Sequence, residues 1–188
     1  NKHSYLLAGA VVFALVLAAC GPKATPTTAP SGPTAATRTA SVSEIVNTVL
    51  GKAAPEATLE QIATGFTLGV GGQVQTGEAS SAKLTLSEGT IVRLSSNTSF
   101  TMQELSTQDG SPLTRLKLEI GKVWVNLTGG GTLEVETPVG VASVRGSFAT
   151  FIFDPGDPND PNDDKLTVFC LETDEQCGAT GDGVDVTL

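Results

Sequence analysis

Histidine and tyrosine are almost absent from this sequence, and each occurs once and early, as His3 and Tyr5. The roughly 168 residues after Cys20 therefore hold no imidazole and no phenol. Histidine is the usual general base and the commonest metal ligand of proteins. Its absence excludes histidine-based catalysis, including any Ser/His/Asp or Cys/His set, and histidine metal ligation in this part of the chain.

Long apolar runs are scarce as well, and the single one spans residues 6–19. Its 14 residues fall short of the about 20 that a membrane-spanning helix needs. The run follows Lys2 and ends in Leu17-Ala18-Ala19-Cys20, which is typical of a secretory signal peptide and resembles the bacterial lipobox. We expect cleavage before Cys20 and lipid on its thiol, with a plain signal peptide or a truncated membrane helix as alternatives.

Basic residues are few: the chain has 11 of them against 20 acidic residues, and Lys2 belongs to the expected signal peptide. All the acidic residues lie after Cys20. A surface this acidic disfavours nucleic acid and anionic lipid headgroups as partners.

Cysteine occurs three times. With Cys20 assigned to lipid, Cys170 and Cys177 form an even pair in an oxidising compartment, which favours a disulfide that closes a short loop. The alternative is a redox or metal site, but CxxC spacing and a neighbouring histidine are both lacking.

The chain divides into three parts: a signal peptide (1–19), a lipidated flexible linker (20–40) and one domain (41–188). The linker consists of Pro, Thr, Ala, Ser and Gly, with Lys23 and Arg38 as its only charges, and has nothing large enough to pack. The alternation at 184–188 suggests a strand still in progress, so we expect the domain to extend past Leu188.

Short β-branched runs cut by glycine predict an all-β domain. The segments 84–94 and 116–125 each indicate a hairpin, turning at Gly89 and at Gly121, followed by strands within 133–144 and 166–171. Residues 41–52 fit a helix or a strand by spacing alone. A short β-solenoid-like roll is slightly favoured over a sandwich of antiparallel hairpins.

Three ordered blocks resemble the FecR domain. They read TGEASSAKLTLSEGTIVRL at 76–94 with Asn97 after it, LEIGKVWV at 118–125, and VETPVGVASVRGSF at 135–148, where TPxGxAxVRG is the most specific stretch. The resemblance aligns residues 41–50 with a first strand. It implies an extracytoplasmic sensing or protein-interaction module, best known in regulators that relay a signal from an outer-membrane receptor to a cytoplasmic sigma factor.

Such regulators carry a cytoplasmic segment and a membrane helix, whereas the apolar run here belongs to the expected signal peptide. We therefore expect a stand-alone FecR-like lipoprotein without direct sigma-factor control, lipid-anchored to a bacterial membrane at the cell surface or in the periplasm. Its expected partner is an envelope protein. The alternative is an envelope-structural or adhesive protein that binds glycan or Ca²⁺.

Arg93 and Arg145 each follow a valine beside turn glycines. A guanidinium fork at either position suits an anionic ligand. Pairing with acidic neighbours on the sheet is favoured over ligand binding, with Glu134 and Glu136 as the candidate partners.

Residues 154–164 concentrate hard oxygen ligands suited to Ca²⁺, without the spacing of an EF-hand. The candidate ligands are Asp154, Asp157, Asp160 and Asp163. Three prolines favour instead an extended solvated loop inserted in a hairpin between Phe153 and Lys165.

Trp124 alternates with Val123 and Val125, so it faces the opposite side of its strand, and the core is favoured over a binding platform. No pair of carboxylates stands out for acid/base work. We therefore expect a protein that is not an enzyme and needs no cofactor other than the Ca²⁺ considered above.

Overall fold

The computed structural model describes residues 38–146, 148–160, 162–170 and 177–187. The predicted signal peptide, Cys20 and the linker up to residue 37 lie outside the described residues. Within the described residues the chain forms 15 strands and no helix, which confirms the predicted all-β class. In that same part of the chain no helix is long and apolar enough to cross a membrane.

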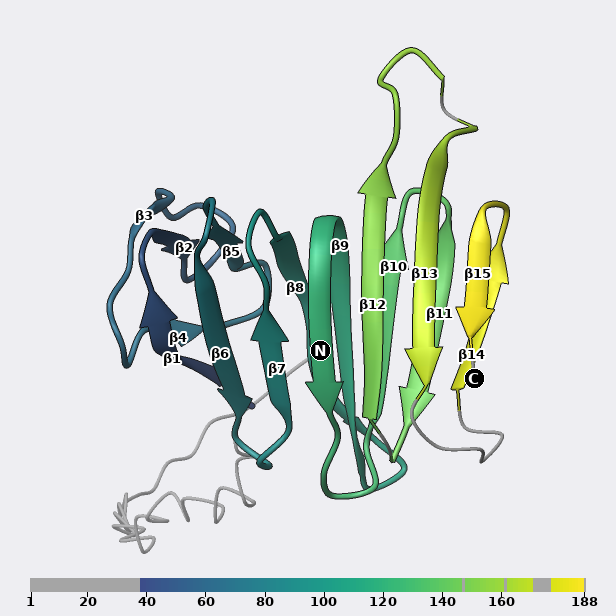
Figure 1. The fold of residues 1–188 in the computed structure, drawn as a ribbon. Helices are drawn as coiled ribbons and strands as arrows, with labels where there is room; N and C mark the ends of the chain where they lie inside the picture. Colours follow the sequence, from purple (N-terminus) through teal and green to yellow (C-terminus); the bar gives the residue numbers. More distant parts are fainter. Residues whose placement is uncertain (1–37, 147, 161, 171–176, 188) are drawn as a thin grey trace, which may run out of the picture. The chain divides into compact units, whose positions relative to one another are not determined.

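The strands form two curled layers that share β9 (Ser111–Asn126) (Figure 1). Layer A contains β1 (Ala40–Val46), β4 (Thr67–Leu68), β6 (Ser81–Leu86), β7 (Ile91–Leu94), β12 (Phe148–Pro155), β13 (Asp164–Cys170) and β15 (Val184–Thr187). Layer B contains β2 (Val49–Lys52), β3 (Glu60–Gln61), β5 (Gln73–Thr76), β8 (Ser99–Gln108), β10 (Thr132–Thr137), β11 (Gly140–Arg145) and β14 (Cys177–Gly181). Neighbouring strands are antiparallel except for the pairs β9–β10 and β13–β15. This curled antiparallel sheet combines the roll and the sandwich that the sequence suggested.

One hydrophobic core lies between the layers. The strict alternation of β6 and β10 buries every second residue, as the two-residue period of a strand requires. Layer B contributes Phe100 and Leu118 and layer A contributes Phe151 and Phe153, all at most 1% exposed. Burying one such side chain contributes about 1.5–3 kcal/mol, so this alternation is the main source of stability.

Four of the places where the chain passes between the layers are corners at which a residue has positive φ. β1 leads into β2 through Asn47 (φ 56), β5 into β6 through Ala79 (φ 51), β7 into β8 through Asn97 (φ 53), and β9 bends at Gly121 (φ 100). Residues other than glycine rarely adopt positive φ, and asparagine is among the residues that adopt it most often. The corners are therefore the places where the fold imposes an unusual backbone on the sequence.

The prediction of a hairpin turn at Gly121 is wrong, because β9 runs through this residue as one strand. Its first part pairs with β8 in layer B, and from Gly121 onward it pairs with β12 and β7 in layer A. A glycine with positive φ serves a bend in a strand as well as a turn between two strands, and local sequence does not distinguish the two.

Hydrogen bonds tie neighbouring corners to one another. The backbone N–H of Gly77 donates to the carbonyl of Thr48 at 3.0 Å, and that of Asn97 donates to the carbonyl of Gly77 at 3.1 Å. The N–H of Lys122 donates to the hydroxyl of Thr98 at 3.0 Å. The first two sequence blocks that resemble the FecR domain thus supply residues of three of these corners, whereas Asn47 and Thr48 lie outside them.

Other predicted elements are confirmed. The hairpin of β6 and β7 turns at Gly89 with φ 96, and β10 and β11 pair as a hairpin. Residues 41–50 are extended, as the resemblance implied, and not helical, but a corner at residues 47–48 divides them between β1 and β2. The acidic segment, residues 154–164, joins β12 to β13. These two strands pair from Ala149↔Cys170 to Pro155↔Asp164.

Candidate functional site

Trp124 lies on the outer face of layer A, so the prediction that it is a core residue is wrong. Val123 and Val125 beside it are fully buried, and the alternation of β9 turns the indole to the other face, where it is half-buried. The Trp124 and Phe148 rings lie 5.6 Å apart at 42° to each other. Aromatic pairs favour such tilted contacts, so Phe148 supports one side of the indole.

A pocket of about 370 Å³ opens beside the indole. Trp124 and Val46 contribute apolar surface to it, and Ser81, Ser95 and Arg93 contribute hydroxyl and guanidinium groups. Val46 is 49% exposed. We call this group the tryptophan pocket; its size lies at the lower end of the range for small-molecule sites.

Glu44 forms one rim of the tryptophan pocket, placed there by an irregularity in β1. Its φ is 48, and the pairing of β1 with β6 shifts register between Ser43 and Val46. Such bulges re-aim side chains and are common next to functional sites. The carboxylate bonds to Lys83 and, at 2.7 Å, to Arg93. Hydrogen bonds from Lys83 and then Arg93 lower the pKa of Glu44 below its usual value.

Arg93 thus has the acidic partner that the sequence suggested, but the partner is Glu44 and not Glu134 or Glu136. Glu134 pairs with Arg115, whose Nη2 lies 2.7 Å from its carboxylate. This contact raises the pKa of Arg115 above its usual value.

Arg145 lies on layer B, apart from Arg93. Its exposed side chain lines a second pocket of about 320 Å³ together with Gln108, Thr132 and Glu134. Within the described residues Arg145 forms no ion pair. The two arginines therefore do not form one anion site, and ligand binding at either stays a prediction.

The acidic segment makes two local turns. Asp157 accepts hydrogen bonds from the backbone and side-chain N–H groups of Asn159 at 2.9 Å, and Asp160 does the same with Asn162. The bond from the Asn159 backbone lowers the pKa of Asp157. Among the described residues no three Asp, Glu, Cys or His side chains converge as metal ligands. Calcium binding by Asp154, Asp157, Asp160 and Asp163 stays a prediction.

The structure joins Cys170 to Cys177 in a disulfide, with their Cα atoms 6.4 Å apart. Cys170 ends β13 in layer A and Cys177 begins β14 in layer B. The bridge therefore links the two layers, in addition to closing a short loop.

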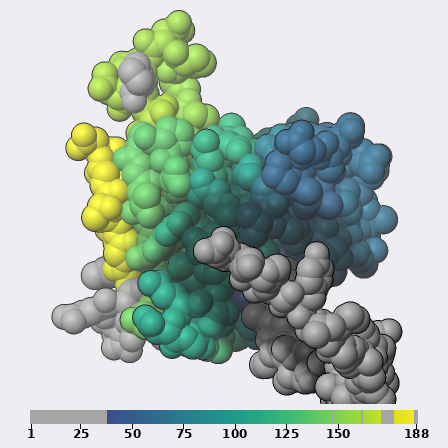
Figure 2. Space-filling view, turned by 180° about the vertical axis from the view of Figure 1, so that it is seen from behind, coloured from purple at the N-terminus to yellow at the C-terminus, as the bar shows by residue number. Residues whose placement is uncertain are grey.

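Strands β14 and β15 form the last edge of the two layers. β14 pairs only with β11 and β15 only with β13, so each leaves its other side open within the described residues. Phe169, Val186 and Val141 lie on or beside these strands and are 39–43% exposed. Figure 2 shows part of this edge, coloured yellow, at one side of the domain. We call it the open edge.

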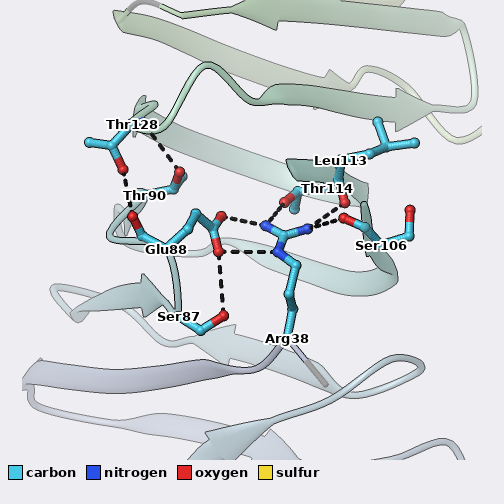
Figure 3. Close-up of polar contacts among 8 residues, drawn as sticks. All are labelled: Arg38, Ser87, Glu88, Thr90, Ser106, Leu113, Thr114 and Thr128. Carbon is cyan, nitrogen blue, oxygen red and sulfur yellow. Dashed lines mark hydrogen bonds and ion pairs between the residues drawn. The ribbon is translucent and has the colours of Figure 1, made fainter. Parts of the chain in front are cut away.

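Sequence reasoning missed Arg38, which it placed in the flexible linker. Its guanidinium instead enters the domain between the layers (Figure 3) and is 10% exposed. All five N–H donors are used, on Glu88 twice, on the carbonyls of Ser106 and Leu113 at 2.7 and 2.6 Å, and on the Thr114 hydroxyl at 3.0 Å. The expected linker therefore ends with residues that belong to the domain, since Ala40 already starts β1.

Arg38 connects segments that lie far apart in the sequence. Glu88 sits in the turn between β6 and β7, and Leu113 is 75 positions away from Arg38. No local pattern marks such a contact; the only hint was a lone arginine at the end of a segment of small residues.

A family model described as FecR protein matches residues 72–173, more than half of the chain. The match extends from just before β5 to just after β13, so it includes the tryptophan pocket apart from its two β1 residues, Glu44 and Val46. No curated protein and no solved structure matches the chain.

Proposed function

Because this chain belongs to the FecR family, we propose that it is a non-catalytic, extracytoplasmic module that senses or binds an envelope protein, held to the membrane by lipid on Cys20. The family suggests a role in sensing and signal transduction. The lipobox-like residues 17–20 support the anchor. The absence of histidine after Cys20 supports a role without histidine-based catalysis.

The observation that carries the proposal is the family match, and the open edge supports it. An open strand presents unpaired N–H and C=O groups, to which an extended segment of a partner adds as a further strand. Phe169 and Val186 add exposed apolar surface at this edge. Aromatic side chains are enriched at protein interfaces, so we place the partner here.

A photo-crosslinking amino acid in place of Phe169 is expected to capture a partner in living cells. Phe169 is 40% exposed beside the open edge. The matched control is the same amino acid at Val70, which is 53% exposed but lies next to β4, at the opposite end of layer A. Mass spectrometry of the crosslinked band identifies the captured protein.

A distinct envelope protein captured at position 169 and not at position 70 supports the proposed interaction. Absence of any crosslinked protein at 169, or the same proteins at both positions, rules out the open edge as the partner site.

Replacing Cys20 with alanine is expected to abolish lipid labelling and to release the protein from the membrane fraction. Acyl chains contribute roughly 0.8 kcal/mol per buried CH₂, and no other lipid attachment is proposed. The measurement is metabolic labelling with an alkyne fatty acid followed by fractionation. A variant that lacks both Cys170 and Cys177 is the control and keeps its label. A wild-type protein without label contradicts the lipid anchor.

A further inference from the structure

The tryptophan pocket is a feature of the domain that the proposed protein interaction does not use. It lies on the outer face of layer A, near the strand ends that meet the corners, and all its lining residues come from β1, β6, β7 and β9 or the residue after β7. Holding Glu44 at positive φ costs free energy without adding to the core. Strained positions of this kind cluster at ligand sites.

The apolar part of the pocket suits a flat ring with weakly polar C–H groups. The face of an indole carries partial negative charge, which attracts C–H groups that carry partial positive charge. Phe148 supports the indole from another side at 5.6 Å, and Val46 provides a further apolar surface. The space has room for one six-membered ring with its substituents.

The polar part of the pocket suits hydroxyl groups. Arg93 donates one hydrogen bond to Glu44, so its remaining N–H groups can donate to a ligand. The Glu44 carboxylate has further acceptor capacity. The hydroxyls of Ser81 and Ser95 both donate and accept. The Glu44 carboxylate offsets part of the positive charge of Arg93 and Lys83, which weakens the attraction of an anionic ligand. The charged rim opposes a purely apolar ligand, such as an acyl chain.

A pyranose has both properties, since one face of the ring bears axial C–H groups and its edge bears vicinal hydroxyls. We propose that the tryptophan pocket binds a neutral pyranose unit of a glycan, with the ring stacked on Trp124 and the hydroxyls bonded to Arg93 and Glu44. This site lies apart from the open edge and does not depend on the protein partner proposed there.

The test uses the intrinsic fluorescence of the full-length protein, because Trp124 is the only tryptophan of the chain. The probes are the neutral trisaccharides maltotriose, N,N′,N″-triacetylchitotriose and mannotriose. The protein is kept in a detergent that has no sugar headgroup. At least one trisaccharide is expected to change the emission of Trp124 saturably, with a Kd of about 1 mM or below. Arg93→Ala is expected to weaken this binding at least about tenfold, whereas Phe169→Ala, on the same sheet but outside the pocket, leaves it unchanged.

Saturation-transfer NMR of the sugar protons provides a second measurement for Trp124→Leu, which has no fluorophore and is expected to lose binding. Circular dichroism verifies that each variant is folded. If none of the three sugars binds the wild-type protein, or if Arg93→Ala binds as the wild-type protein does, the inference is wrong. Either result leaves crosslinking at Phe169 unaffected, so the two proposals fail separately.

Discussion

Replacing Arg38 with alanine is expected to lower the free energy of unfolding by about 3 kcal/mol, and Tm by about 10 °C. The substitution leaves the Glu88 carboxylate, 16% exposed, without its cation, and leaves the Thr114 hydroxyl and two backbone carbonyls without their donor. Removing one partner of a largely buried ion pair costs more than the pair itself contributes. Thermal and urea unfolding of the purified protein measure the effect.

Two controls distinguish the buried contacts of Arg38 from an ordinary surface ion pair. Lys165→Ala removes a pair with Asp185 whose side chains are 55% and 62% exposed, and is expected to cost less than about 1 kcal/mol. The double variant Arg38→Met/Glu88→Met is expected to be more stable than Arg38→Ala, because no buried charge is left alone. A loss for Arg38→Ala as small as that for Lys165→Ala contradicts the structural role of Arg38.

Replacing Gly121 with alanine is expected to destabilise the domain by at least about 3 kcal/mol. The φ of 100 is strained for any residue with a Cβ. A Cβ built there lies only 2.5 Å from the Cα of Thr98, a backbone atom of the neighbouring corner. Either the bend of β9 or the corner at Thr98 has to move, and both connect layer A to layer B. Denaturant unfolding gives the loss.

Gly110→Ala provides the comparison. Gly110 also has positive φ, at 80, but nothing lies within 4 Å of a Cβ built there. This variant is expected to cost only the conformational penalty of about 1–2 kcal/mol. Equal losses at the two positions show that φ alone matters and that the close approach of the corners does not.

Much of the fold follows from local sequence, because alternation and turn residues act over a few positions. The hairpin at Gly89 and the strand-loop-strand unit around residues 154–164 are confirmed for this reason. Gly121 shows where local sequence fails to predict the fold, because its neighbours alternate as they do around Gly89. Whether a glycine ends a strand or bends it depends on what pairs with both sides.

The residues of the candidate site were harder to predict from the sequence than the strands. Alternation correctly places Trp124 opposite Val123 and Val125, but it does not say which face is the interior. Leucine and phenylalanine side chains of β6, β7 and β12 already fill much of the space between the layers, and the indole lies outside. The partner of Arg93 depended on a bulge at Glu44, which no pattern in β1 marks.

The sequence by itself determined the all-β class and the family, because composition and short motifs are local properties. It also predicts lipid on Cys20 and excludes histidine chemistry after that residue. Only the tertiary structure decided that Gly121 is a corner, that Trp124 lines a pocket and that Arg38 clamps the start of the domain. Each of these depends on residues tens of positions apart, such as Arg38 and Thr114 at a separation of 76. Contacts of that range form only when two layers close around one core.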